Sequence, residues 1–146
     1  GRFAGGGPTN IVCDYVTLEA EARSLVTEKL HRQIAAMREA VESAAREFGA
    51  EAEFTSEIVY PSFRFAEDDE VVQIAKSAIS RIGSTPRTFK SGGGSDANIF
   101  NGKGVPTVNL AIGYEHIHTT REQIHADNLV KTAELVLALV AEAAKR

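Results

Sequence analysis

The hydrophobic positions in the first third of the chain change their period once. Between Val16 and Ala22 apolar and polar side chains alternate, and the pattern extends over residues 11–25. A period of two predicts a β-strand with one solvent-exposed face. From Thr27 onwards the apolar residues recur at spacings of three and four, which predicts an amphipathic helix capped by Thr27 and ending at Gly49. Its apolar stripe consists of Leu30, Ile34, Met37, Val41, Ala45 and Phe48.

Four later segments also have clear patterns. Residues 53–65 have strand character but contain Pro61, which is typical of an edge strand because proline cannot donate to a ladder. The apolar positions of residues 68–82 recur with helical spacing. Residues 105–112 are mostly apolar, which predicts a strand buried on both faces, as in a parallel sheet. A last helix follows, with Asp127 as its expected cap.

The order of elements changes near Pro61. Residues 1–62 are predicted to form a strand, a helix and a strand with exposed strand faces. Residues 63–146 are predicted to form a helix, a glycine-rich loop, a buried strand, a second loop and a helix. We therefore predict an α/β protein in two parts, 1–62 and 63–146.

Composition excludes several classes of function. Apolar residues make up 43% and charged residues 25% of the 146 residues, which is ordinary for a folded globular protein and not for a disordered one. The net charge of −4 and the lack of a basic run argue against nucleic-acid binding. No apolar run approaches the length of a membrane span. Cys13 is the single cysteine, so no intrachain disulfide is expected and the cytoplasm is the expected compartment.

A glycine-rich segment at residues 91–98 is the first candidate site. Its three consecutive glycines precede a short expected helix. Their backbone N–H groups are not covered by side chains, and such groups beside a helix N-terminus can bind an anion. The segment lacks the GK[ST] of a P-loop and the spacing of a dinucleotide fingerprint. A flexible turn in which Ser95 or Asp96 caps the helix is the alternative, and the sequence leaves both open.

A loop with two histidines follows the apolar run and is the second candidate site. His116 and His118 stand there together with Glu115 and Glu122. Ligands of open α/β sheets gather beyond the carboxyl ends of strands, and imidazoles with carboxylates bind zinc. A metal site needs at least three converging protein ligands, which this stretch does not guarantee. Two histidines on a surface loop therefore remain the alternative.

Two other charged features have plain structural interpretations. His125 and Asp127 have the spacing of an HxD metal motif, but their place at the start of the last helix favours a cap. Arg23 stands two residues after Glu21 on the exposed side of the first predicted strand. It is expected in a surface ion pair, and the binding of a carboxylate is its second possible role.

Four motifs in this order resemble one known family. They are Gly5-Gly6-Gly7-Pro8-Thr9-Asn10-Ile11-Val12, Glu21-Ala22-Arg23-Ser24-Leu25, Gly93-Gly94-Ser95-Asp96-Ala97, and Gly113-Tyr114 with His118-Thr119-Thr120-Arg121-Glu122. Together they resemble the C-terminal part of a di-zinc aminopeptidase of the peptidase T-like kind. The wider superfamily contains succinyl-diaminopimelate desuccinylase, acetylornithine deacetylase and zinc carboxypeptidases. The resemblance covers nearly the whole chain.

The resemblance implies a fold and a set of site residues. It implies that residues 1–62 belong to an inserted lid and dimerisation domain of ferredoxin-like type, here only in part. Residues 63–146 would then be the C-terminal segment of the α/β catalytic domain. His118 resembles the last zinc ligand. Asn10 and Arg23 resemble lid residues that contact substrate, and Arg23 resembles the one that holds a carboxylate of the substrate. The loop that lines the substrate pocket is matched by Gly93, Gly94 and Ser95.

The resemblance also implies what this chain lacks. The family's bridging aspartate, Glu-Glu pair with the general base, and lid histidine have no match in the 146 residues. His125 and Asp127 do not substitute for the family's HxD motif, because they follow the last ligand and open the terminal helix. No catalytic residue is therefore expected here. The chain also lacks an initial Met, and we expect it to be a fragment of a longer metallopeptidase that hydrolyses short peptides with water activated by two zinc ions.

The expected partners are a short peptide substrate and a second copy bound through the lid, and the isolated chain is expected to be inactive. Two alternatives remain open from the sequence. One is a deacylase of N-acyl amino acids from the same superfamily. The other is a non-catalytic dimerisation or interaction module, in which residues 1–62 offer a helix and a strand edge to a partner.

Overall fold

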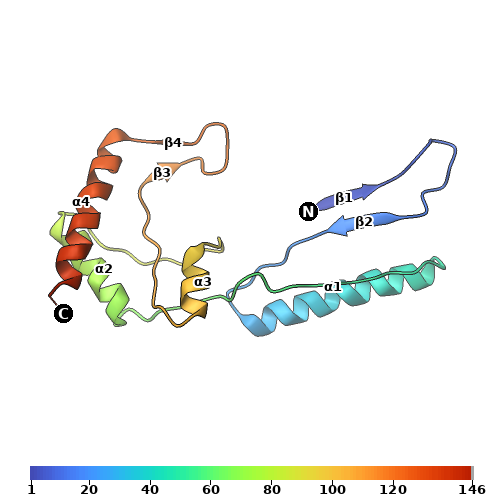
Figure 1. Ribbon diagram of the computed structural model, residues 1–146, viewed down its shortest axis with the longest axis horizontal. Helices are drawn as coiled ribbons and strands as arrows, with labels where there is room; N and C mark the ends of the chain where they lie inside the picture. Colours follow the sequence, from blue (N-terminus) through green and yellow to red (C-terminus); the bar gives the residue numbers. More distant parts are fainter. Residues whose placement is uncertain (146) are drawn as a thin grey trace. The chain divides into compact units, whose positions relative to one another are not determined.

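The computed structural model describes residues 1–145, which form four α-helices and two small antiparallel sheets. Figure 1 shows the elements in chain order: β1 (Arg2–Gly5), β2 (Val16–Glu19), α1 (Thr27–Glu47), α2 (Glu70–Arg81), α3 (Asp96–Gly102), β3 (Tyr114–Glu115), β4 (Gln123–Ile124) and α4 (Ala126–Ala143). The chain divides into two compact units, Gly1–Ser62 and Phe63–Arg146.

The first unit contains a β-hairpin. β1 and β2 pair antiparallel, with Phe3 opposite Leu18 and Gly5 opposite Val16. The predicted strand over residues 11–25 is therefore too long, because only Val16–Glu19 has a strand beside it. The residues before β2 form a turn instead, in which the Ile11 N–H donates to the Pro8 carbonyl at 3.0 Å.

The long helix α1 of the same unit follows the predicted period. It starts at Thr27, but its N-cap is Val26 rather than Thr27, and it ends just before Gly49, whose φ of +66° suits the left-handed stop. None of its residues is buried. The predicted stripe is at best half-buried, because the two-stranded hairpin is too small a layer to cover a helix of 21 residues.

The predicted strand over residues 53–65 is wrong for this structure. The segment is extended but pairs with no strand among the described residues. Its Phe54 contacts α1 instead, where the Arg38 guanidinium lies 4.6 Å from the ring centroid. Arg38 Nη1 also donates to the Phe54 carbonyl at 3.2 Å. A cation–π contact and one hydrogen bond thus replace the ladder that an edge strand would need.

The second unit is built on the helix pair α2 and α4, which lie against each other in Figure 1. Ala78, Leu135 and Ala138 are buried between them, and the half-buried apolar residues around them are Ile79, Ile82, Leu110 and Leu139. The small side chain of Ala78, which is fully buried, allows the two helices to approach closely. Arg81 Nη1 lies 3.0 Å from Glu142 Oε1 and joins the ends of the two helices.

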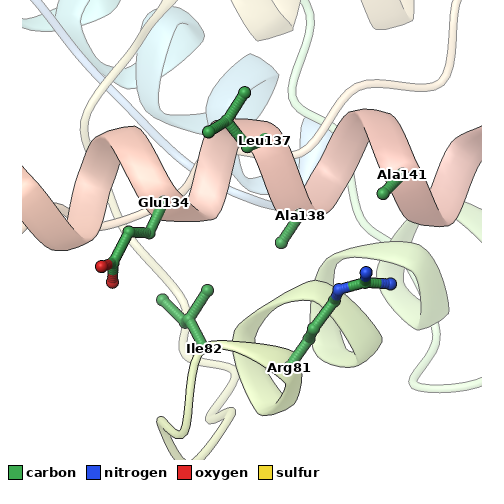
Figure 2. A pocket seen from close by; sticks show the side chains of 6 residues that line it. All are labelled: Arg81, Ile82, Glu134, Leu137, Ala138 and Ala141. Atoms are coloured by element: carbon green, nitrogen blue, oxygen red, sulfur yellow. The ribbon is translucent and has the colours of Figure 1, made fainter.

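A hollow of about 450 Å³ opens along the same helix pair (Figure 2). Figure 2 shows the Arg81 guanidinium on α2 and the Glu134 carboxylate on α4 at its edges, with Ala138 between them. None of the residues predicted to form a site lines this hollow, so it belongs to the packing of the helices and not to the candidate site.

The predicted buried strand over residues 105–112 is also wrong for this structure. Val105 is 53% exposed, and the segment pairs with no strand in the part of the chain that the structure describes. The Asn101 side chain at the end of α3 holds the segment instead. Its Oδ1 accepts the Thr107 N–H at 3.1 Å and its Nδ2 donates to the Thr107 carbonyl at 2.7 Å, as a neighbouring strand would.

The start of α4 differs from the prediction by two residues. His125 is its N-cap, and Asp127, the expected cap, lies inside the first turn. There its carboxylate interacts favourably with the positive end of the helix dipole without capping a backbone N–H. His125 and Asp127 thus lie at a helix start, as the sequence predicts, although the N-cap is His125 and not Asp127.

Candidate functional site

The loop with two histidines is the connection of a short hairpin in the second unit. β3 and β4 pair antiparallel, with Tyr114 opposite Ile124 and Glu115 opposite Gln123. The side chains of the second pair also interact, because Gln123 Nε2 donates to Glu115 Oε2 at 3.1 Å. The hairpin therefore fixes both ends of the loop formed by residues 116–122.

Hydrogen bonds within the loop define its shape. The His116 carbonyl accepts the Thr119 N–H at 3.2 Å and the Thr119 hydroxyl at 2.7 Å. Thr119 Oγ1 accepts the Arg121 N–H at 3.1 Å, and the Thr119 carbonyl accepts the Glu122 N–H at 3.1 Å. Thr119 is thus the centre of a compact turn, although its side chain is exposed.

His118 has an unusual backbone in this loop. Its φ is +61° and that of His116 is +54°, and this left-handed region costs a non-glycine residue about 1 kcal/mol or more. Glu122 offsets the cost, since its Oε2 accepts the His118 N–H at 2.7 Å. A charge-assisted bond of this kind is stronger than one between neutral groups. The imidazole of His118 is exposed at the tip of the loop.

A single imidazole is a suitable donor for zinc, but it is not a zinc site. Among residues 1–145 no group of three or more His, Cys, Asp or Glu side chains is placed to hold a metal ion. Zinc in proteins takes at least three protein ligands. The described residues alone therefore do not fit a zinc ion, and His118 can serve as a ligand only beside donors from outside this chain.

The glycine-rich segment precedes α3 as a turn. Ser95 is the N-cap of α3 and forms a capping box with Asn98, in which the Ser95 N–H donates to Asn98 Oδ1 at 3.0 Å. The Gly93 N–H donates to Ser91 Oγ at 3.2 Å. The structure shows a helix cap here, and the cap is Ser95 rather than Asp96.

Asn109 connects this turn to the extended segment after α3. Its Nδ2 lies 2.9 Å and its Oδ1 3.1 Å from Ser95 Oγ. Asn109 is a polar residue within the mostly apolar run of residues 105–112. A polar residue in such a run was the signal that the segment has a specific hydrogen-bond partner.

Arg23 forms the surface ion pair that its sequence position predicts. Its Nε is hydrogen bonded to Glu21 Oε1, and both side chains are exposed. The hydrogen bond from Arg23 lowers the pKa of the Glu21 carboxyl, and the same bond raises the pKa of the guanidinium. Asn10, the other predicted substrate residue of the first unit, is exposed in the turn between Pro8 and Ile11.

One further residue shapes the site, and the sequence indicates it only as a member of the fourth motif, without a role. Gly113 precedes β3 with a φ of +81°, and a Cβ there would lie 2.6 Å from Asn128 Nδ2. That Nδ2 donates to the Gly113 carbonyl at 3.1 Å. Gly113 therefore fastens the hairpin to the first turn of α4, and no larger residue fits without moving Asn128.

Comparison with known proteins identifies the family. The sequence profile of peptidase family M20/M25/M40 matches residues 5–142, which is most of the chain. The chain belongs to peptidase family M20/M25/M40. In the part of this family member that the structure describes, no helix is long and apolar enough to cross a membrane.

The curated relatives include members of the peptidase T group. The uncharacterized protein YqjE of Bacillus subtilis is 54% identical over 145 residues, which are 99% of this chain and 39% of that protein. Peptidase T of Geobacillus kaustophilus is 32% identical over 122 residues, which are 81% of this chain and 29% of that protein. The chain of the M20/M25/M40 family described here thus spans less than half of each of these relatives.

Two solved structures are similar over the whole chain. The aminopeptidase PepT from Bacillus cereus is 56% identical, with a TM-score of 0.83 over 99% of this chain and 39% of that one. A tripeptidase from Staphylococcus aureus is 42% identical, with a TM-score of 0.90 over 100% of this chain and 39% of that one. They confirm the predicted α/β fold class and the resemblance to peptidase T-like members of the M20/M25/M40 family.

Proposed function

We propose that this chain is the C-terminal part of a metal-dependent aminopeptidase that hydrolyses short peptides, with tripeptides as its substrates. The observation that carries the proposal is the likeness over nearly the whole chain to a structure named aminopeptidase PepT, at 56% identity. The likeness to a tripeptidase, at 42% identity, supports the same substrate class. Family membership alone would leave the substrate open.

His118 is the residue that we propose as a zinc ligand of the longer protein. The hairpin and Glu122 hold its backbone in one conformation while its imidazole stays exposed, which is how a ligand must be presented to a metal held partly by other residues. Two zinc ions are proposed for the whole enzyme, where they would polarise the scissile carbonyl and acidify a bound water. The remaining ligands and the general base would come from outside the described residues.

Arg23, Asn10 and the turn at Gly93, Gly94 and Ser95 are the proposed substrate contacts. The Arg23 guanidinium is exposed and charged, and its planar geometry suits the carboxylate of a peptide C-terminus. Asn10 offers an exposed amide in its turn. The glycines before α3 leave room for a peptide backbone to approach, since they have no side chains.

A homodimer formed through the first unit is the proposed assembly. Its hairpin and the loop between the strands expose several large apolar side chains, which are Phe3, Ile11, Val12, Tyr15 and Leu18. Large exposed apolar patches mark protein–protein interaction sites, which supports this assembly. The cytoplasm is the proposed compartment, because Cys13 is an exposed free thiol that a reducing environment preserves.

The test is a comparison of substrates with the full-length protein. We expect it to hydrolyse unblocked tripeptides and to lose the activity on treatment with a chelator. The purified 146-residue chain should stay at background with added zinc, cobalt or manganese, because residues 1–145 contain no complete ligand set. Preferential hydrolysis of N-acyl amino acids by the full-length protein would identify a deacylase instead. Chelator-sensitive turnover by the isolated chain would contradict the proposed division of the site.

A further inference from the structure

We propose that Glu21 is a positioning residue for substrate binding: its carboxylate holds the Nε side of the Arg23 guanidinium and leaves the terminal nitrogens directed to the free carboxylate of a peptide. The proposal rests on the proposed function, because it gives Arg23 a peptide carboxylate to bind. It adds a specificity-determining residue that touches no substrate atom itself.

The contact between the two side chains is local and specific. Glu21 and Arg23 are two residues apart in the segment between β2 and α1, and their side chains meet there. Glu21 Oε1 meets Nε and not a terminal nitrogen. Because only one residue separates the partners, little chain entropy is lost when the pair forms. The pair therefore orients the guanidinium at small cost.

The geometry of a guanidinium decides what remains for a ligand. Its five N–H groups form two edges that each match a carboxylate, one through Nε and one through the two terminal nitrogens. A carboxylate at Nε occupies the first edge, and the second stays in the same rigid plane. A substrate carboxylate that binds the second edge would meet a group already fixed in orientation, which reduces the entropy lost on binding.

Charges around Arg23 support this arrangement. Tyr60, from the extended segment after α1, lies close enough that its ionised phenol would raise the pKa of Arg23, a smaller effect than the bond to Glu21. The Arg23 guanidinium therefore stays protonated while its Nε is paired with Glu21. The neighbouring acidic residue Glu19 pairs instead with Arg2, with 3.8 Å between Oε1 and Nη1. Glu19, at the end of β2, is thus a matched control two residues before Glu21.

The first arm of the test measures the order of Arg23 in the whole 146-residue chain. ¹⁵N relaxation of the Arg23 Nε–H reports how rigidly the guanidinium is held. We expect greater mobility in Glu21→Ala, mobility close to wild type in Glu21→Gln, whose amide oxygen still accepts from Nε, and no change in Glu19→Ala. An Nε–H equally mobile in the wild-type chain and in Glu21→Ala would overturn the proposal.

The second arm measures KM and kcat in the full-length protein for a tripeptide and its C-terminal amide. Glu21→Ala should raise KM for the free carboxylate about fivefold with kcat nearly unchanged, since a charge-assisted contact loses its fixed geometry. Glu21→Gln and Glu19→Ala should stay within about twofold of wild type, and the amide should respond to none of the three. Arg23→Lys should raise KM for the free carboxylate in the same selective way.

The outcomes distinguish failure of the role proposed for Glu21 from failure of the proposed peptidase function. A lower KM in Glu21→Ala would show that Glu21 competes with substrate, and an unchanged KM would make it an ordinary surface partner; either result overturns the proposal. No effect of Arg23→Lys would overturn it too, since Arg23 would then bind no carboxylate. If the wild-type full-length protein hydrolysed no peptide, the proposed function itself would have failed.

Discussion

His118 combines a left-handed backbone, an anchored amide and an exposed imidazole. A residue strained in this way persists only where its surroundings hold it, and such positions concentrate at functional sites. His116 has a similar φ, but its carbonyl is used within the loop by Thr119. The two histidines therefore differ in the backbone contacts that hold them, although they are two residues apart.

Replacing His118 with Ala in the full-length protein should lower the zinc content and abolish peptide hydrolysis, because an alanine offers no donor to the metal. His116→Ala and His125→Ala should leave both nearly unchanged, since His125 is a helix cap and His116 acts through its backbone. Elemental analysis of the three purified variants measures the effect. Unchanged zinc in the His118 variant would refute the assignment, whatever the rate.

Sequence reasoning could single out His118 and Arg23 but not how each is held. The order of four motifs identified the positions. The backbone bond from His118 to the Glu122 carboxylate and the use of Nε by Glu21 depend on side-chain geometry that no spacing specifies. The role of Gly113 could not be predicted for the same reason, because its close neighbour Asn128 is 15 residues away.

The packing of α2 against α4 predicts how two leucine substitutions change the free energy of unfolding. Leu135 is 8% exposed and packs against Ala78, whereas Leu137 on the same helix is 73% exposed. Leu135→Ala should lower the free energy of unfolding of the chain by about 2–3 kcal/mol, since it leaves a cavity in the core. Leu137→Ala removes the same atoms from the surface and should cost less than about 0.5 kcal/mol. Urea denaturation followed by circular dichroism measures both, and equal losses would contradict the packing.

Helices were predictable and most strands were not, for one physical reason. The bonds of α1, α2 and α4 close within each helix, so a local period of apolar residues is sufficient to indicate them. The apolar run at residues 105–112 and the segment 53–65 need strands beside them, and the described residues offer none. The pattern of these two segments indicates a preference for β-strand, and a strand forms only where a neighbouring strand is present.

At the scale of the whole molecule, acidic groups link the two helices and the segments around them. Hydrogen bonds from Lys145 and then Arg81 lower the pKa of the Glu142 carboxyl, and bonds from Lys76 and then Thr88 lower that of Glu67. Both residues therefore release their protons more readily in the folded chain than in the unfolded one. The charged forms favour folding.

We expect the stability of the chain to fall in acid. A carboxyl with a folded pKa below its unfolded value of about 4.5 contributes fully above that pH, and the contribution is lost as the pH falls through the folded pKa. Glu142→Gln should be less stable than wild type at neutral pH, and the two should converge below pH 4.5 as the wild-type carboxyl is protonated. Urea midpoints measured across the pH range give the comparison. A constant gap between the proteins in acid would contradict the linkage.

The bonds that shape the loop at residues 116–122 begin and end inside it, and the hairpin around it is closed by Glu115 and Gln123. The loop is in that sense self-contained. Substitutions elsewhere in the chain can change the position of the loop but have little effect on its conformation. Related proteins can therefore change the residues around the loop, and with them the substrate, while His118 keeps the same backbone conformation.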